Sequence, residues 1–193
     1  MRLVSVFLMM GLVSLPPFDA MAGGRAELAA LSRAFDESVL RNDDDNAKPV
    51  STKLVFKDSA SGGTASYTAD NFTVLDITGL TTSGMTIGSI AGGGTILLGG
   101  KTLTVGGNNA STAYSGVISG SSGRLVKEGT GTLTLTGANT YLAGTTVNGG
   151  TLRLGASNVL TFNRPVTVNS GGTLDLNNFN TTLGQVTDAL LRD

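Results

Sequence analysis

The sequence predicts an all-β protein in which short strands stack into a parallel β-helix, or solenoid, behind a short N-terminal signal and helical segment. The string Gly-Thr-Leu-x-Leu begins at Gly131, Gly150 and Gly172, so it recurs after 19 and then 22 residues. Each copy alternates polar and apolar residues with a period of two, which places its leucines on one face of a strand. Repeated units at this spacing are typical of structures that grow by stacking.

Composition supports the same fold class. Gly accounts for 28 of 193 residues and charged residues for only 14%, while 40% of residues are hydrophobic. The glycines do not fall at every third position, which excludes collagen. The regular alternation of hydrophobic residues argues against disorder for most of the chain. Many short strands joined by Gly, Asn and Ser turns fit this composition.

Charge and missing residue types exclude several functions. A formal net charge of −1 gives no electrostatic basis for binding nucleic acid or an anionic membrane surface. The absence of Cys removes disulfides, thiolate catalysis and Cys-based zinc sites, and the absence of His removes the commonest general base and metal ligand. We therefore expect no nucleic-acid partner, no cofactor and no metal.

Residues 1–22 have the pattern of a secretory signal peptide. A single charge, Arg2, precedes the apolar run Leu3–Leu15, and small residues end the segment at Ala20 and Ala22. The alternative is a membrane anchor, but the apolar run is too short to cross about 30 Å of hydrocarbon as a helix. Asp19, just before the expected cleavage site, leaves the cleavage position open.

Residues 23–51 are predicted to form an amphipathic helix followed by an acidic linker. Apolar residues recur on one helical face at Leu28, Leu31, Phe35 and Val39. We expect this face to cover the open end of the following sheet, because an uncovered end offers unpaired backbone groups to other chains. A partner-binding helix is the alternative. The aspartates Asp43–Asp45 lack the ligand spacing of a calcium loop and are interpreted as a solvated linker.

Residues 52–190 are predicted to form the parallel β-helix, although the period is irregular before Gly116. Further expected strands include Thr95–Leu98, Thr102–Val105 and Val117–Ile118. Each coil is expected to contain two strands, one with a Val pair and one with a Leu pair. Asn148 and Asn169 occupy equivalent corners between them, and we predict that they stack as a ladder.

Alignment of the three strings predicts which side chains face inward. Parallel stacking at about 4.8 Å forms two internal columns. These are Leu133/Leu152/Leu174 and Leu135/Leu154/Leu176. The same alignment places Arg153 beside Asp175 on the outer face. Each buried leucine contributes roughly 1.5–3 kcal/mol, so the leucine columns rather than the ion pair are expected to hold the fold.

A longer pattern resembles a known family. The runs Gly116–Gly120, Leu125–Tyr141 and Gly144–Leu152 look like the passenger-associated transport repeat of bacterial autotransporters. The repeat is clearest at residues 116–155, and flanking segments extend the likeness over roughly residues 80–180. The resemblance implies a right-handed parallel β-helix that is exported through the outer membrane and displayed at, or released from, the cell surface. It also implies that the repeat assists folding and secretion and is not catalytic.

The resemblance implies one partner that the sequence does not show. No alternating amphipathic strands of a membrane barrel follow Gly184. We therefore expect the outer-membrane translocator barrel to lie outside these residues. A truncated autotransporter, a fragment and a standalone exported protein all remain open.

Two motifs and one group of charged residues were considered as sites. Residues 94–102 differ in spacing from a phosphate-binding loop, and no helix is expected after them. Residues 171–175 resemble a calcium-binding β-roll, but Leu174 stands where that repeat needs Gly. The charged residues that could serve a polysaccharide-degrading β-helix are Lys127, Glu128, Arg153 and Asp175. Glycoside hydrolysis normally requires a pair of carboxylates. Glu128 and Asp175 do not share a predicted column, so they do not form such a pair. The sequence thus predicts no catalytic, cofactor-binding or metal-binding residues.

The sequence favours a structural passenger segment: a stacked scaffold that aids secretion and folding. The alternative is an adhesin-like module whose Thr- and Asn-rich outer face contacts a host surface or glycan. A polysaccharide-degrading enzyme is the remote alternative.

Overall fold

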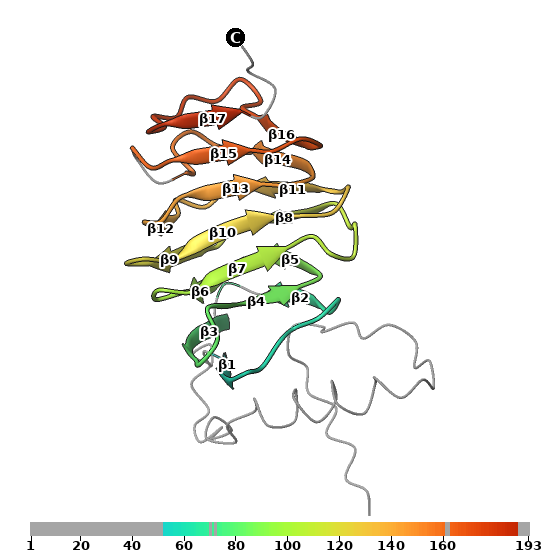
Figure 1. The fold of residues 1–193 in the computed structure, drawn as a ribbon, viewed down its shortest axis with the longest axis vertical. Helices are drawn as coiled ribbons and strands as arrows, with labels where there is room; N and C mark the ends of the chain where they lie inside the picture. Colours follow the sequence, from blue (N-terminus) through green and yellow to red (C-terminus); the bar gives the residue numbers. More distant parts are fainter. Residues whose placement is uncertain (1–51, 70, 72, 161–162, 189–193) are drawn as a thin grey trace, which may run out of the picture.

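The chain folds into a stack of parallel strands. The computed structural model describes residues 52–69, 71, 73–160 and 163–188, and within these residues it contains seventeen strands and no helix. Figure 1 shows the coils lying one above another along the long axis, from β1 at one end to β17 at the other. The parallel β-helix predicted from the repeated strings is confirmed. The expected signal peptide, amphipathic helix and acidic linker lie outside the described residues.

Three parallel sheets form the sides of the stack. Sheet A contains β1 (Thr52–Asp58), β3 (Thr73–Leu80), β6 (Thr95–Leu97), β9 (Val117–Gly120) and β12 (Thr140–Tyr141). Sheet B contains β2 (Ser66–Ala69), β5 (Ser89–Gly92), β8 (Thr112–Tyr114), β11 (Thr132–Leu135), β14 (Gly150–Leu154) and β16 (Gly172–Asp175). Sheet C contains β4 (Gly84–Ile87), β7 (Thr102–Val105), β10 (Arg124–Lys127), β13 (Thr145–Val147), β15 (Val166–Val168) and β17 (Val186–Asp188).

From β3 to β14 the chain visits the sheets in the order A, C, B, so each of these coils has three strands. The prediction of two strands per coil is therefore wrong for the coils from β3 to β14. It fits only coils without a third strand, such as the last one, where β15 contains the Val pair Val166 and Val168 and β16 contains Leu174. Sheet A strands β6 and β9 were expected, at Thr95–Leu98 and Val117–Ile118, but were not assigned to a third side of the coil, and the two-residue β12 was not expected.

The leucine columns predicted for sheet B are confirmed, with one exception. Leu133 pairs with Leu152, and Leu152 pairs with Leu174, in parallel register. Leu133, Leu135, Leu152 and Leu154 are buried, and Leu174 packs against the same core. Leu176 was expected inside but is 43% exposed. The reason is that β16 ends at Asp175 and no later strand of sheet B covers it within the described residues.

The corners between sheets C and B need glycine. Gly106, Gly129, Gly150 and Gly171 all have positive φ there, a conformation that residues with a Cβ seldom adopt. A Cβ on Gly129 would also collide with the carbonyl oxygen of Gly106 in the preceding coil. Glycine therefore allows consecutive corners to approach as closely as the strands do.

Candidate functional site

The residues considered for catalysis do not form a common site. Arg153 and Asp175 are outer residues of sheet B, and Arg153 Nε lies 2.7 Å from Asp175 Oδ2. This confirms the predicted contact across consecutive coils. The Arg153 side chain and the backbone N–H of Asn177 both donate to Asp175, and they hold the pKa of its carboxyl below the ordinary 3.8. Both side chains are partly exposed to solvent.

Lys127 and Glu128 lie at the corner between sheets C and B. Lys127 was considered as an outer residue, and this assignment is wrong because its side chain is 1% exposed. Parallel pairing places Lys127 between Val105 and Val147, both of which point into the core. Lys127 is thus separated from the outer-face residues Arg153 and Asp175.

The Lys127 ammonium binds three backbone carbonyl oxygens. Its Nζ donates to Glu128 at 2.6 Å and Gly129 at 3.3 Å in its own corner, and to Gly149 at 3.1 Å in the next coil. Each of these carbonyls would cost about 1–3 kcal/mol if left buried without a donor. Burial lowers the pKa of the ammonium below its ordinary 10.5. A cavity of about 10 Å³ borders the side chain, which is too small for a cofactor.

Asn139 makes comparable bonds at the corner between sheets B and A. Its Oδ1 accepts the N–H of Ile118 at 2.8 Å, and its Nδ2 donates to Gly137 at 3.1 Å and to Val159 at 2.8 Å. The side chain is 5% exposed. One asparagine therefore connects three consecutive coils.

A third buried polar contact closes the corner between sheets A and C. The hydroxyls of Tyr141 and Thr145 lie 2.7 Å apart, and both residues are buried. Burial raises the pKa of Tyr141 to about 12, although the bond to Thr145 acts in the opposite direction. Buried side chains therefore form hydrogen bonds at all three corners of the coil from β10 to β13.

The two motifs considered for ligands also have structural explanations. Residues 94–102 contain β6, a turn and the start of β7, so a strand stands where a phosphate-binding loop would need a helix. Residues 171–175 contain a corner glycine and β16. Among the described residues, no group of three or more Asp and Glu side chains could hold a metal ion.

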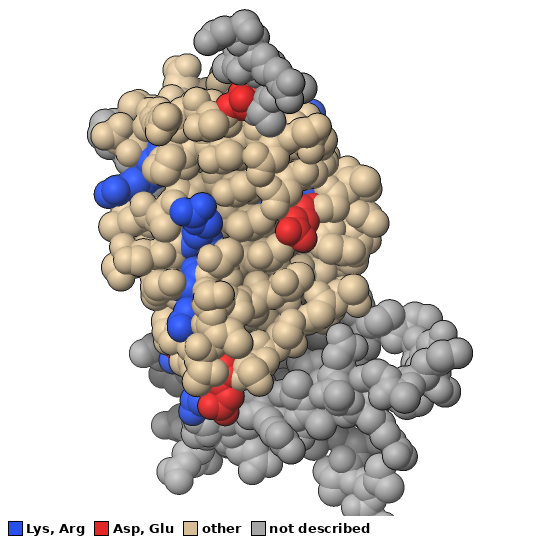
Figure 2. Space-filling view, in the orientation of Figure 1, with Lys and Arg blue, Asp and Glu red and all other residues tan. Residues whose placement is uncertain are grey.

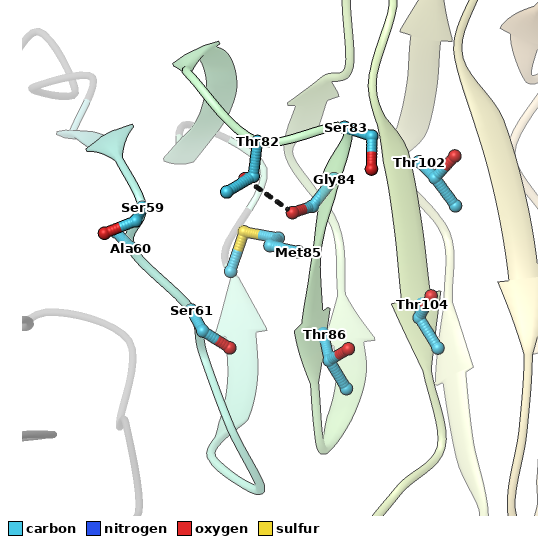
Figure 3. Close-up of a pocket in the computed structure, with 10 residues that line it drawn as sticks. All are labelled: Ser59, Ala60, Ser61, Thr82, Ser83, Gly84, Met85, Thr86, Thr102 and Thr104. Atoms are coloured by element: carbon cyan, nitrogen blue, oxygen red, sulfur yellow. Dashed lines mark hydrogen bonds between the residues drawn. The ribbon is translucent and has the colours of Figure 1, made fainter.

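An open hollow lies on the outer face of β4 and β7 (Figure 3). It has a volume of about 380 Å³, and seven of its ten lining residues are Ser or Thr. Thr102 and Thr104 project from β7 beside Thr86 of β4, while the Thr82 hydroxyl donates to the Gly84 carbonyl at 3.0 Å. None of the lining residues is charged or aromatic. The hollow can offer hydroxyl groups to a neutral ligand.

The outer surface carries little charge. Figure 2 shows a face that is mostly uncharged, with a short line of basic side chains and a few scattered acidic ones. Asn169 Nδ2 donates to Asn148 Oδ1 at 2.7 Å in an exposed contact between consecutive coils. The predicted stacking of Asn148 and Asn169 is confirmed. The described residues also contain no helix long and apolar enough to span a membrane.

These features define a class of protein: a parallel β-solenoid. In its coil from β10 to β13, buried polar side chains form hydrogen bonds at all three corners. Residues 125–154, which contain that coil, match the family model described as the passenger-associated-transport-repeat. Over 75 residues the chain is 41% identical to the adhesin BmaC autotransporter of Brucella suis biovar 1 (strain 1330). The aligned region covers 39% of this chain and 2% of that protein. No solved structure gives a significant match.

The matches and the fold together support an autotransporter passenger with a passenger-associated transport repeat, built as a β-solenoid scaffold. The buried polar residues Lys127, Asn139 and Thr145 lie within the matched segment. The sequence analysis did not predict that these three side chains are buried. For Lys127 it could have done so, because residues two apart on a strand share a face and Leu125 faces the core.

Proposed function

We propose that this chain is a structural passenger segment that is exported and then displayed at the cell surface or released. The observation that carries the proposal is the unbroken parallel register through sheets B and C, which includes the transport repeat. A structure of this kind can form coil by coil, because each coil pairs only with its neighbours. Such local assembly suits a chain that must cross a membrane before it folds.

The proposal includes the route and the partner. Residues 1–22 act as a signal peptide, residues 23–51 form a helix and linker, and residues 52–190 form the scaffold. An outer-membrane translocator barrel is the expected partner. A fusion of residues 1–22 to a reporter that is active only after export tests the first step. Reporter activity equal to that of a fusion lacking these residues would reject the signal.

Deletion of one coil in register tests the scaffold function. The full chain is fused to a translocator barrel, and surface exposure of an N-terminal epitope is measured by flow cytometry in intact cells. Deleting residues 133–151 joins Thr132 to Leu152 and removes most of the repeat. Deleting residues 75–95 joins Val74 to Ile96 and is the matched control. We expect the first deletion to reduce display much more strongly; equal display of the two variants would contradict a special role for the repeat.

Adhesion is a second candidate function, favoured by the relative's name and by the uncharged, hydroxyl-lined hollow. Beads coated with the full chain should then be retained on host-cell monolayers or immobilised neutral glycans. Replacing Thr86 and Thr104 by Val removes two hydroxyls with little change in side-chain volume. The same change at Thr134, on the outer face of sheet B, is the control. Retention no greater than that of albumin-coated beads would reject adhesion.

We do not propose an enzymatic function. The charged outer residues Arg153 and Asp175 bind each other, and the similarity to an adhesin favours a role in contact over one in catalysis.

A further inference from the structure

Two buried side chains of the repeat bind backbone groups in more than one coil. Lys127 joins the corner that follows β10 to the corner that follows β13, through the carbonyl oxygens of Gly129 and Gly149. Asn139 joins Ile118, in the preceding coil, to Val159, in the following one. Together the two side chains connect three consecutive coils at two different corners.

We propose that Lys127 and Asn139 are interlocks that make the repeat coil open and close together with the coils on either side. The inference rests on the proposed scaffold function and assigns part of it to two residues. Coils that touch only their neighbours can open one at a time from an end. A buried polar group shared between coils opposes such opening, because its partners would lose their hydrogen bonds before water replaced them.

Burial of the side chain distinguishes the bonds of Lys127 and Asn139 from two exposed polar bonds between coils. Lys101 Nζ donates to the Thr82 carbonyl at 3.0 Å, and Asn169 donates to Asn148 at 2.7 Å, but both of these bonds are exposed. Water can replace the partners of an exposed bond at little cost. Lys101 and Asn169 therefore provide matched controls, with the same residue types and the same kind of link between coils.

Native-state hydrogen exchange of the full chain tests the inference. The Glu128 amide is bonded to Val105 and reports on the junction with the preceding coil, while the Asn148 amide, bonded to Lys127, and the Asn139 amide, bonded to Val159, report on two corners of the junction with the following coil. In the unmodified protein we expect the three amides to share one opening constant within about threefold. A shared constant is the signature of a single cooperative unit.

Substitution of Lys127 or Asn139 should allow the junction between the repeat coil and the following coil to open separately from the preceding junction. In Lys127→Met the opening constant of the Asn148 amide should rise at least tenfold relative to that of the Glu128 amide. In Asn139→Ala the opening constant of the residue 139 amide should likewise rise at least tenfold relative to that of the Glu128 amide. Lys101→Met and Asn169→Ala should leave the three constants equal. These results would support the interlock, because a purely structural loss would raise all three constants by the same factor.

Three results would overturn the inference. The first is unequal opening constants in the unmodified protein, a measurement that remains available if Lys127→Met does not fold. The second is an equal rise at all three amides in both variants. The third is division of the unit by either control substitution. Surface display that still depends on the repeat would then preserve the scaffold function while rejecting the interlock.

Discussion

Adjacent residues on β14 should differ greatly in their contribution to stability. Leu152 is fully buried between Leu133 and Leu174, while Arg153 points outward to an exposed ion pair. Replacing Leu152 by Ala removes most of a buried side chain and leaves a cavity, which typically costs 2–5 kcal/mol. Arg153→Thr removes only a solvent-screened contact, so its free energy of unfolding should be nearly unchanged.

Urea denaturation followed by circular dichroism measures this difference. With an m-value of about 1–3 kcal/mol/M, a loss of 2–5 kcal/mol lowers the midpoint for Leu152→Ala by about 1 M or more. Leu152→Asp should prevent folding, because it buries a carboxylate without a partner. Equal midpoint shifts for Leu152→Ala and Arg153→Thr would refute the assignment of inner and outer faces.

Three further predictions concern a carboxylate, a corner glycine and the asparagine ladder. Although burial raises the pKa of Asp76, hydrogen bonds from Lys53 and Thr78 outweigh it and hold the pKa below the ordinary 3.8. The resulting contribution to the free energy of unfolding is present above pH 3.8 and is lost as the pH falls through the folded-state pKa. When the free energy of unfolding is measured against pH in the acid range, Asp76→Asn should therefore show a smaller loss than the unmodified protein. Gly129→Ala should destabilise the chain by more than about 1 kcal/mol in chemical denaturation, because φ is +67° and the Cβ meets backbone; an unchanged midpoint would contradict the corner geometry. Asn169→Ala should change the thermal midpoint little, since its bond is exposed, and a large drop would show that the ladder is structural.

The sequence alone was sufficient to predict which side chains of a strand face inward and which face outward. Alternation placed Leu133 and Leu152 inside, and the aligned copies placed Arg153 beside Asp175. Both depend only on a period of two and on parallel stacking, which local sequence can specify. Leu176 shows where this reasoning fails, because burial also requires a following strand to cover the side chain.

The corners were harder to predict, because their stability depends on contacts between residues distant in sequence. Nothing local indicates that the carbonyl of Gly149 will meet the side chain of Lys127, 22 residues earlier. Asn139 was likewise recognised only as part of a motif, and its bonds to Ile118 and Val159 follow from the closing of three coils. The third sheet was missed for a related reason: local sequence predicted its strands β6 and β9, but the side of the coil on which a strand lies depends on its partners in neighbouring coils.

Disulfide trapping is the most direct test of the parallel stack on which the scaffold function depends. The chain has no Cys, so introduced pairs have no competitors. Ala113 and Thr134 are direct partners on β8 and β11, and their Cα atoms should lie about 4.8 Å apart, within disulfide range. Ala113 and Thr132 are offset by two residues, which places them about 8 Å apart by the same strand geometry. We predict rapid oxidation of the Ala113→Cys/Thr134→Cys pair and little for Ala113→Cys/Thr132→Cys. Equal or reversed cross-linking would contradict the stacking of these coils in parallel register.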